Sequence, residues 1–124
     1  MSDTTICLAK YIKQFTERLL ESDFINVDFN LPLRYLDFED SPDCWGCFND
    51  TISIKIIKII IKIEVTYPDY SDYSIINVHL YSKDLGVDKY ISNSRELKSE
   101  LKKIVELLEE KAGSKAAEDF AEYI

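Results

Sequence analysis

The sequence contains little glycine and little proline, with only three of each among its 124 residues. Flexible linkers are rich in glycine and semi-rigid linkers in proline, so a chain of loosely joined modules is not expected. Hydrophobic residues make up 46% of the chain, which is enough for a core and too much for a disordered protein. The length is that of one typical domain, roughly 100–150 residues. We therefore expect a single domain over residues 1–124.

The chain also lacks a hydrophobic segment long enough to cross a bilayer, which takes about 20 residues. Its longest apolar stretch, from Ile52 to Val65, is interrupted by three lysines and one glutamate. The N-terminal residues lack the basic start and apolar centre of a signal peptide. Three cysteines, an odd number, suit a reducing compartment. We expect no membrane partner and a cytoplasmic location, which would be the host cytoplasm for a viral protein.

Basic residues are in the minority, with 15 Lys and Arg against 23 Asp and Glu, and the net charge is −8. Such a surface repels nucleic acids and anionic lipids, because both are negatively charged. We therefore expect no direct nucleic-acid binding, and the charge favours a basic protein as the partner. The alternative is nucleic-acid binding through Lys55, Lys58 and Lys62 of the apolar stretch.

Motifs that bind phosphate or activate a nucleophile are missing. Neither G-x-G-x-x-G nor a Walker sequence is present. The one histidine, His79, alternates with Ile76, Val78 and Leu80 and is predicted on the solvent side of a strand. The sequence indicates no Ser-His-Asp arrangement around it, and a nucleophilic Cys-His pair is kept as an alternative. We expect a protein that is not an enzyme and that carries no cofactor.

The most conspicuous motif is the C-x-x-C pair formed by Cys44 and Cys47. Such a pair can perform thiol–disulfide exchange or supply half of a zinc site. Nearby aspartates would raise the thiol pKa, which disfavours a redox role. A complete zinc site would need Cys7 and His79, since no second local pair is present. We expect no metal here, and a zinc module or small enzyme using Cys44 and Cys47 is a further alternative.

Two long helices are predicted from apolar residues that recur every three or four positions. The first covers residues 4–21, with the stripe Leu8, Ile12, Phe15 and Leu19. The second runs from Asn93 to Ala112, with the stripe Leu97, Leu101, Ile104 and Leu108. Asn93 with Glu96 resembles a capping box, and Gly113 is a suitable αL stop. A short helix is expected over residues 114–124.

The strongest strand signal covers residues 51–67, where apolar and polar residues alternate. The alternation changes parity between Ile56 and Ile57, so one regular strand cannot place all the isoleucines on one face. We expect a β-bulge within Ile56–Lys58, which would bend the long strand around the core. The alternative is a tight turn at Ile57-Lys58, which is less favoured because neither residue is a typical turn former.

Shorter strands are predicted around residues 33–38 and 76–81, and a further one is expected within residues 83–92. The strand at 76–81 forms a hairpin with the long strand before it. The expected fold class is α+β, in the order α-β-β-β-α-α. An antiparallel sheet of three to four strands contains a long bent hairpin, and the N- and C-terminal helices cover one of its faces.

Acidic residues are concentrated in residues 23–50, which contain seven acids and one base. Asp37 and Glu39 would share one face of a strand, about 7 Å apart, and Asp40 and Asp43 follow. A second acidic zone consists of Glu106, Glu109, Glu110, Glu118, Asp119 and Glu122. Such rows of carboxylates can imitate a nucleic-acid backbone to a basic partner. The alternative is a solvated surface that keeps the protein soluble.

A tyrosine-rich segment follows the long strand, with Tyr67, Tyr70 and Tyr73 separated by Asp69 and Asp72. Tyrosine is enriched where proteins bind each other, and acids set charge complementarity. We expect this segment, with the acids at 37–43, to contact the partner. Ordinary loop packing is the alternative.

These features favour a small acidic inhibitor that binds a nuclease or another nucleic-acid-handling complex and occludes its basic surface. The abundance of isoleucine, lysine and tyrosine is typical of AT-rich genomes, including those of many phages and viruses. A phage or viral anti-defence protein of the anti-CRISPR type would fit. The alternative is an immunity protein that neutralises a nuclease toxin, and a homodimer is compatible with either.

Overall fold

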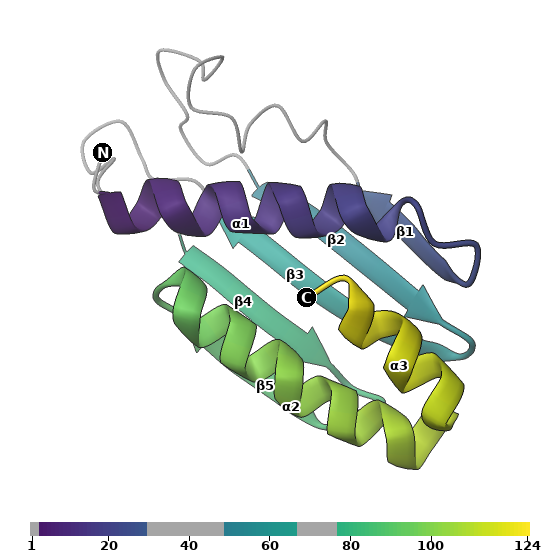
Figure 1. Ribbon diagram of the computed structural model, residues 1–124. Coiled ribbons are helices and arrows are strands. Elements are labelled where there is room, and N and C mark those ends of the chain that lie inside the picture. Colours follow the sequence, from purple (N-terminus) through teal and green to yellow (C-terminus); the bar gives the residue numbers. More distant parts are fainter. Residues whose placement is uncertain (1–2, 30–48, 67–76) are drawn as a thin grey trace.

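The computed structural model of the chain describes residues 3–29, 49–66 and 77–124. The elements in chain order are α1 (Asp3–Leu19), β1 (Ile25–Phe29), β2 (Asn49–Ile56), β3 (Ile59–Thr66), β4 (Asn77–Ser82), β5 (Val87–Ile91), α2 (Ser94–Ala112) and α3 (Ser114–Glu122). The strands form one antiparallel sheet in sequence order, and the helices lie on one face of it (Figure 1). The predicted α+β class is confirmed, and the described residues contribute five strands to the sheet instead of the expected three to four.

The core lies between the helices and the sheet. The predicted stripe of α1 is buried, and so is the predicted stripe of α2. α3 contributes Phe120, whose ring meets that of Phe15 edge-on with the centroids 5.8 Å apart, so aromatic packing links α3 to α1. None of the helices in the described ranges has the length and apolar character needed to span a bilayer.

The start of α2 follows from its capping residues. The side chain of Asn93 accepts a hydrogen bond from the backbone N–H of Glu96 at 2.8 Å, as predicted. The Glu96 carboxylate accepts from the N–H of Ser92 at 3.3 Å, one residue before the cap. The helix ends at Gly113, whose φ is positive (97°) but whose ψ of 166° is extended, so this is not the expected αL stop.

The expected β-bulge within Ile56–Lys58 is wrong. β2 and β3 are two separate strands of eight residues, and Ile57 and Lys58 form the turn between them. Ile56 pairs with Ile59 and Ile54 pairs with Ile61. A two-residue turn pairs residues that are three apart in sequence, so both can face the core although their parity differs. The predicted long bent strand is therefore a tight hairpin.

Ile57 explains why this turn is hard to find in the sequence. Its φ is +59°, whereas Lys58 does not have a positive φ. A positive φ at the first central position alone is the pattern of a type II′ turn, which normally has glycine there. A β-branched residue in this conformation is a strained outlier. The usual sequence signal for a hairpin turn is therefore missing.

The first strand of the sheet was not predicted. Ile25 pairs with Ile56, and Val27 pairs with Ile54, so β1 extends the sheet beyond β2. The strand expected at residues 33–38 lies outside the described residues. β5 lies within residues 83–92, where a further strand was expected, and this prediction is confirmed.

Candidate functional site

The residues predicted to bind a partner lie outside the described residues. They are the acids Asp37, Glu39, Asp40 and Asp43 and the tyrosine-segment residues Tyr67, Asp69, Tyr70, Asp72 and Tyr73. Cys44 and Cys47 also lie outside them. The roles given to these residues stay predictions, and the candidate sites below are built from residues 3–29, 49–66 and 77–124.

The face of the sheet opposite the helices carries a cluster of aromatic and charged side chains around His79. The register places Glu64 of β3 opposite His79 of β4, and His79 opposite Tyr90 of β5. Tyr81, two residues along β4, is opposite Asp88 of β5. Residues two apart in a strand share a face, so these five side chains gather on one surface. We call Glu64, His79, Tyr81, Asp88 and Tyr90 the His79 cluster.

His79 is the centre of this cluster. Its Nε2 lies 2.5 Å from Oδ1 of Asp88, and its Nδ1 lies 3.7 Å from Oε2 of Glu64. Its ring stacks on that of Tyr90, with the centroids 4.5 Å apart and the planes at 14°. The histidine is on the side of the strand opposite Val78 and Leu80, as predicted, but its neighbours leave only 22% of its side chain exposed.

The cluster favours the charged form of the imidazole. The hydrogen bond with Asp88 raises the pKa of His79 above its ordinary value of 6.5. The negative charge of Asp88 and the interaction with Glu64 add to this rise, while partial burial of the ring opposes it. The imidazolium form therefore bridges carboxylates from β3 and β5.

This geometry does not suit a general base. A base needs a free nitrogen directed at the proton that it removes. Both ring nitrogens of His79 instead face carboxylates, its only hydrogen-bond and ion-pair partners in the described part of the chain. Within the ranges described, no three His, Cys, Asp or Glu side chains form a group suited to a metal ion. The arrangement can stabilise the sheet and present the ring of Tyr90, which is 72% exposed.

The partners of His79 were missed by the sequence analysis, although part of the signal was there. Glu64 alternates with the buried residues of β3, so its place on the same face as His79 could be predicted. Asp88 and Tyr90 depend on the register of β5, which is set by the turn over residues 83–86. In this turn Gly86 has a φ of +68°, and the Ser82 hydroxyl accepts a hydrogen bond from the N–H of Leu85. Sequence spacing alone does not specify such a turn.

The second acidic zone lies within the described residues and forms one end of the helical layer. Glu106, Glu109 and Glu110 are in the second half of α2, and Glu118, Asp119 and Glu122 are in α3; all but the half-buried Asp119 are exposed. Asp119 accepts a hydrogen bond from the Ser22 hydroxyl at 2.9 Å, which joins α3 to the segment after α1. Residues 17–23 and 104–122, here called the acidic end, contain nine acids and three bases.

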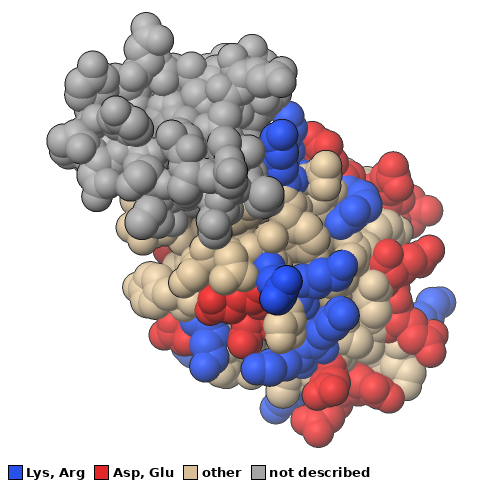
Figure 2. Space-filling view, turned by 60° about the vertical axis from the view of Figure 1, so that its left-hand side comes forward, with Lys and Arg blue, Asp and Glu red and all other residues tan. Residues whose placement is uncertain are grey.

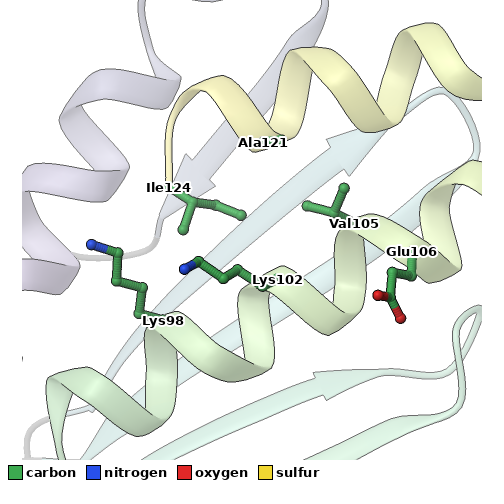
Figure 3. A pocket seen from close by; sticks show the side chains of 6 residues that line it. All are labelled: Lys98, Lys102, Val105, Glu106, Ala121 and Ile124. Atoms are coloured by element: carbon green, nitrogen blue, oxygen red, sulfur yellow. The ribbon is translucent and has the colours of Figure 1, made fainter.

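The first half of α2 contains more bases than acids. Its bases are Arg95, Lys98, Lys102 and Lys103 and its acids are Glu96 and Glu100, of which Glu100 forms an ion pair with Lys103 at 3.2 Å. Figure 2 shows Lys and Arg side chains in a band across the middle of one face, with Asp and Glu toward its right-hand and lower edges and a further group of Asp and Glu beside the band on the left. Lys98 and Lys102 line an open groove of about 370 Å³ between α2 and α3, which is also lined by Val105, Glu106, Ala121 and Ile124 (Figure 3). Bases therefore outnumber acids in the first half of α2, and acids outnumber bases in its second half.

Comparisons with known proteins found no relative of this chain. The chain matches no protein-family model, no curated protein and no solved structure.

Proposed function

We propose that the protein is a small acidic inhibitor that binds a nucleic-acid-handling protein and occludes its basic surface. The acidic end is the observation that supports this most strongly. Its carboxylates come from residues 17–23 at and after the end of α1, from the second half of α2 and from α3, and the hydrogen bond between Ser22 and Asp119 joins the first of these segments to α3. A surface with an excess of carboxylates complements a protein site built to hold phosphates.

The position of these acids within α2 also supports a role in recognition. Glu109 and Glu110 are in the last turn of the helix, where the macrodipole favours positive charge. Each misplaced charge of this kind costs about 0.3–1 kcal/mol, and only Lys111 in that turn has the favoured sign. Helix stability therefore does not explain the two glutamates, which favours a role for them in recognition.

The His79 cluster supports the binding class over the enzyme class, because both imidazole nitrogens face carboxylates. A phage or viral anti-defence protein of the anti-CRISPR type, acting in the host cytoplasm, is the form of inhibitor that size, charge and composition favour. An immunity protein that neutralises a nuclease toxin would use the same surface against a different target.

The proposal is tested by affinity capture from cells of the source organism, followed by binding measurements with the purified target. Glu109→Lys is compared with Asp28→Lys, which makes the same charge change at an exposed site on β1, away from the acidic end. We expect a basic nucleic-acid-handling target that loses nucleic acid when the inhibitor is added. Glu109→Lys should weaken binding more than Asp28→Lys. A protein that retards DNA or RNA in a gel without any target would contradict the proposal.

A further inference from the structure

Three large apolar side chains in or beside the acidic end are left partly exposed. Leu20 is 52% exposed and Phe24 39% exposed, and both lie in the connection between α1 and β1. Ile57, in the turn between β2 and β3, is 52% exposed. Ile25 pairs with Ile56, so this turn lies beside Phe24, and Figure 1 shows both connections at the same end of the sheet. We call Leu20, Phe24 and Ile57 the apolar tip.

The backbone around the tip is held by specific hydrogen bonds. The Ser22 hydroxyl accepts from the N–H groups of Phe24 and Ile25, both at 3.1 Å, and donates to Asp119. The N–H of Leu20 continues the helical pattern by bonding to the carbonyl of Thr16 at 3.2 Å. The connection between α1 and β1 therefore presents its apolar side chains from a fixed backbone, which lowers the entropy cost of binding.

Ile57 is costly for the fold in two ways. Its positive φ is one that L side chains with a branched Cβ rarely adopt, and asparagine or glycine would fit it better. Its side chain also keeps half of its surface in water and so gains only part of the stabilisation that a buried isoleucine provides. A residue that breaks a local rule without a gain in stability is expected where function requires it.

We infer that the apolar tip is the anchor of the interface and inserts into an apolar recess that is bordered by lysine or arginine on a basic protein. This inference rests on the proposed function and names the surface that performs it. Interfaces combine an apolar centre, which carries most of the binding energy, with a polar rim.

The charges around the tip decide which kind of partner fits. Its neighbours in sequence are the acids Glu17, Glu21 and Asp23 and the bases Arg18, Lys55 and Lys58, and the hydrogen bond to Ser22 adds the carboxylate of Asp119 from α3. Because the acidic end beside the tip carries nine acids and three bases, a second copy docking by the same surface would meet a net negative charge, and an anionic membrane or nucleic acid would be repelled in the same way. A basic protein is the partner that the rim complements.

The test introduces the photo-crosslinker p-benzoylphenylalanine at position 24 or 57, with position 90 as the control, in cells of the source organism. Tyr90 is 72% exposed and is located in β5, two strands away from β3, on the sheet face that the helices leave open. We expect adducts with one basic protein from positions 24 and 57 and none with that protein from position 90. Adducts with a second copy of this chain, or no adducts from the tip, would overturn the inference.

Binding to the purified adduct partner then separates this inference from the proposed function. Ile57→Asn, which suits the positive φ, should weaken binding about tenfold or more without lowering the melting temperature, and Phe24→Ala should weaken it similarly. Tyr90→Ala should bind within about twofold of wild type, as expected for a site outside the interface. If Glu109→Lys weakens binding but the tip variants do not, the tip inference fails and the proposed function stands. If neither Glu109→Lys nor either tip variant weakens binding, the tip inference and the proposed function both fail.

Discussion

The sole histidine of the chain allows one electrostatic prediction to be tested without ambiguity. His79 faces Asp88 at 2.5 Å and Glu64 at 3.7 Å, so its pKa should lie above the ordinary value of 6.5. Titration followed by NMR observes the single set of histidine ring signals directly. Asp88→Asn should lower this pKa more than Glu64→Gln does, because the closer carboxylate makes the hydrogen bond.

The raised pKa also predicts how stability depends on pH. Protonation of His79 favours the folded state, so its contribution is fully present below the unfolded pKa near 6.5 and is lost as pH rises through the folded pKa. The side chains of His79, Glu64 and Asp88 are 22%, 49% and 67% exposed, which makes this a surface interaction. Exposed ion pairs contribute about 0.2–1 kcal/mol to stability, and we expect the free energy of unfolding to fall by an amount in that range as His79 loses its proton.

The assay is urea unfolding of wild type and His79→Gln between about pH 5.5, where carboxylates are ionised, and about pH 8.5. The stability difference between the two proteins should shrink as pH rises through the folded pKa, because only the wild type loses the imidazolium contribution. A His79 pKa at or below 6.5, or a stability difference that does not change over this range, would refute the reasoning.

Three further predictions concern the core, a helix cap and metal binding. The Tyr11 hydroxyl is buried without a hydrogen-bond partner among the described residues, and burial raises its pKa. Tyr11→Phe should therefore raise the free energy of unfolding by about 1 kcal/mol in urea while keeping the stack on Phe15, and a loss of stability would contradict this. Asn93→Ala should lower the free energy of unfolding by about 1 kcal/mol, because the helix loses its cap. Ser99→Ala, on the exposed side of α2, should change the free energy of unfolding little. Elemental analysis should find no stoichiometric zinc, and a chelator should leave the melting temperature unchanged; one zinc per chain, lost together with stability in Cys44→Ser, would overturn this.

The helices could be predicted from the sequence because their signal is local and redundant. Each stripe of α1 and α2 repeats an apolar residue four times at helical spacing, and all eight residues are buried in the structure. Asn93 adds a capping signal at the start of α2. When apolar periodicity and capping residues both indicate a helix over the same residues, few alternative structures are left.

The hairpin between β2 and β3 could not be predicted in the same way. The parity change at Ile56 was visible, but a bulge and a two-residue turn both produce one. Turn-forming residues normally decide between them, and Ile57 and Lys58 supply none. Tertiary packing of the isoleucines on both strands outweighs the local preference at Ile57. The strain recorded in its positive φ shows where local preference and fold disagree.

The site was less predictable than the fold. The sequence places His79 on the solvent side of a strand, but the partners of His79 come from β3 and β5 and depend on strand register. The apolar tip combines Leu20 and Phe24 with Ile57, which is over thirty residues away in sequence. The pairing of β1 with β2 brings them together, but the sequence does not predict β1 and gives the turn at Ile57-Lys58 only as the less favoured alternative.

The most direct test is the association rate constant between the captured target and wild type, Glu109→Lys or Asp28→Lys, measured as salt concentration increases. The Debye length falls from about 10 Å at 0.1 M salt to about 3 Å at 1 M, so charge-steered association should slow steeply for wild type. Asp28→Lys should remain close to wild type, while Glu109→Lys should associate more slowly at low salt and depend less on salt. Association that is indifferent to both salt and the Glu109 reversal would contradict binding through an acidic surface.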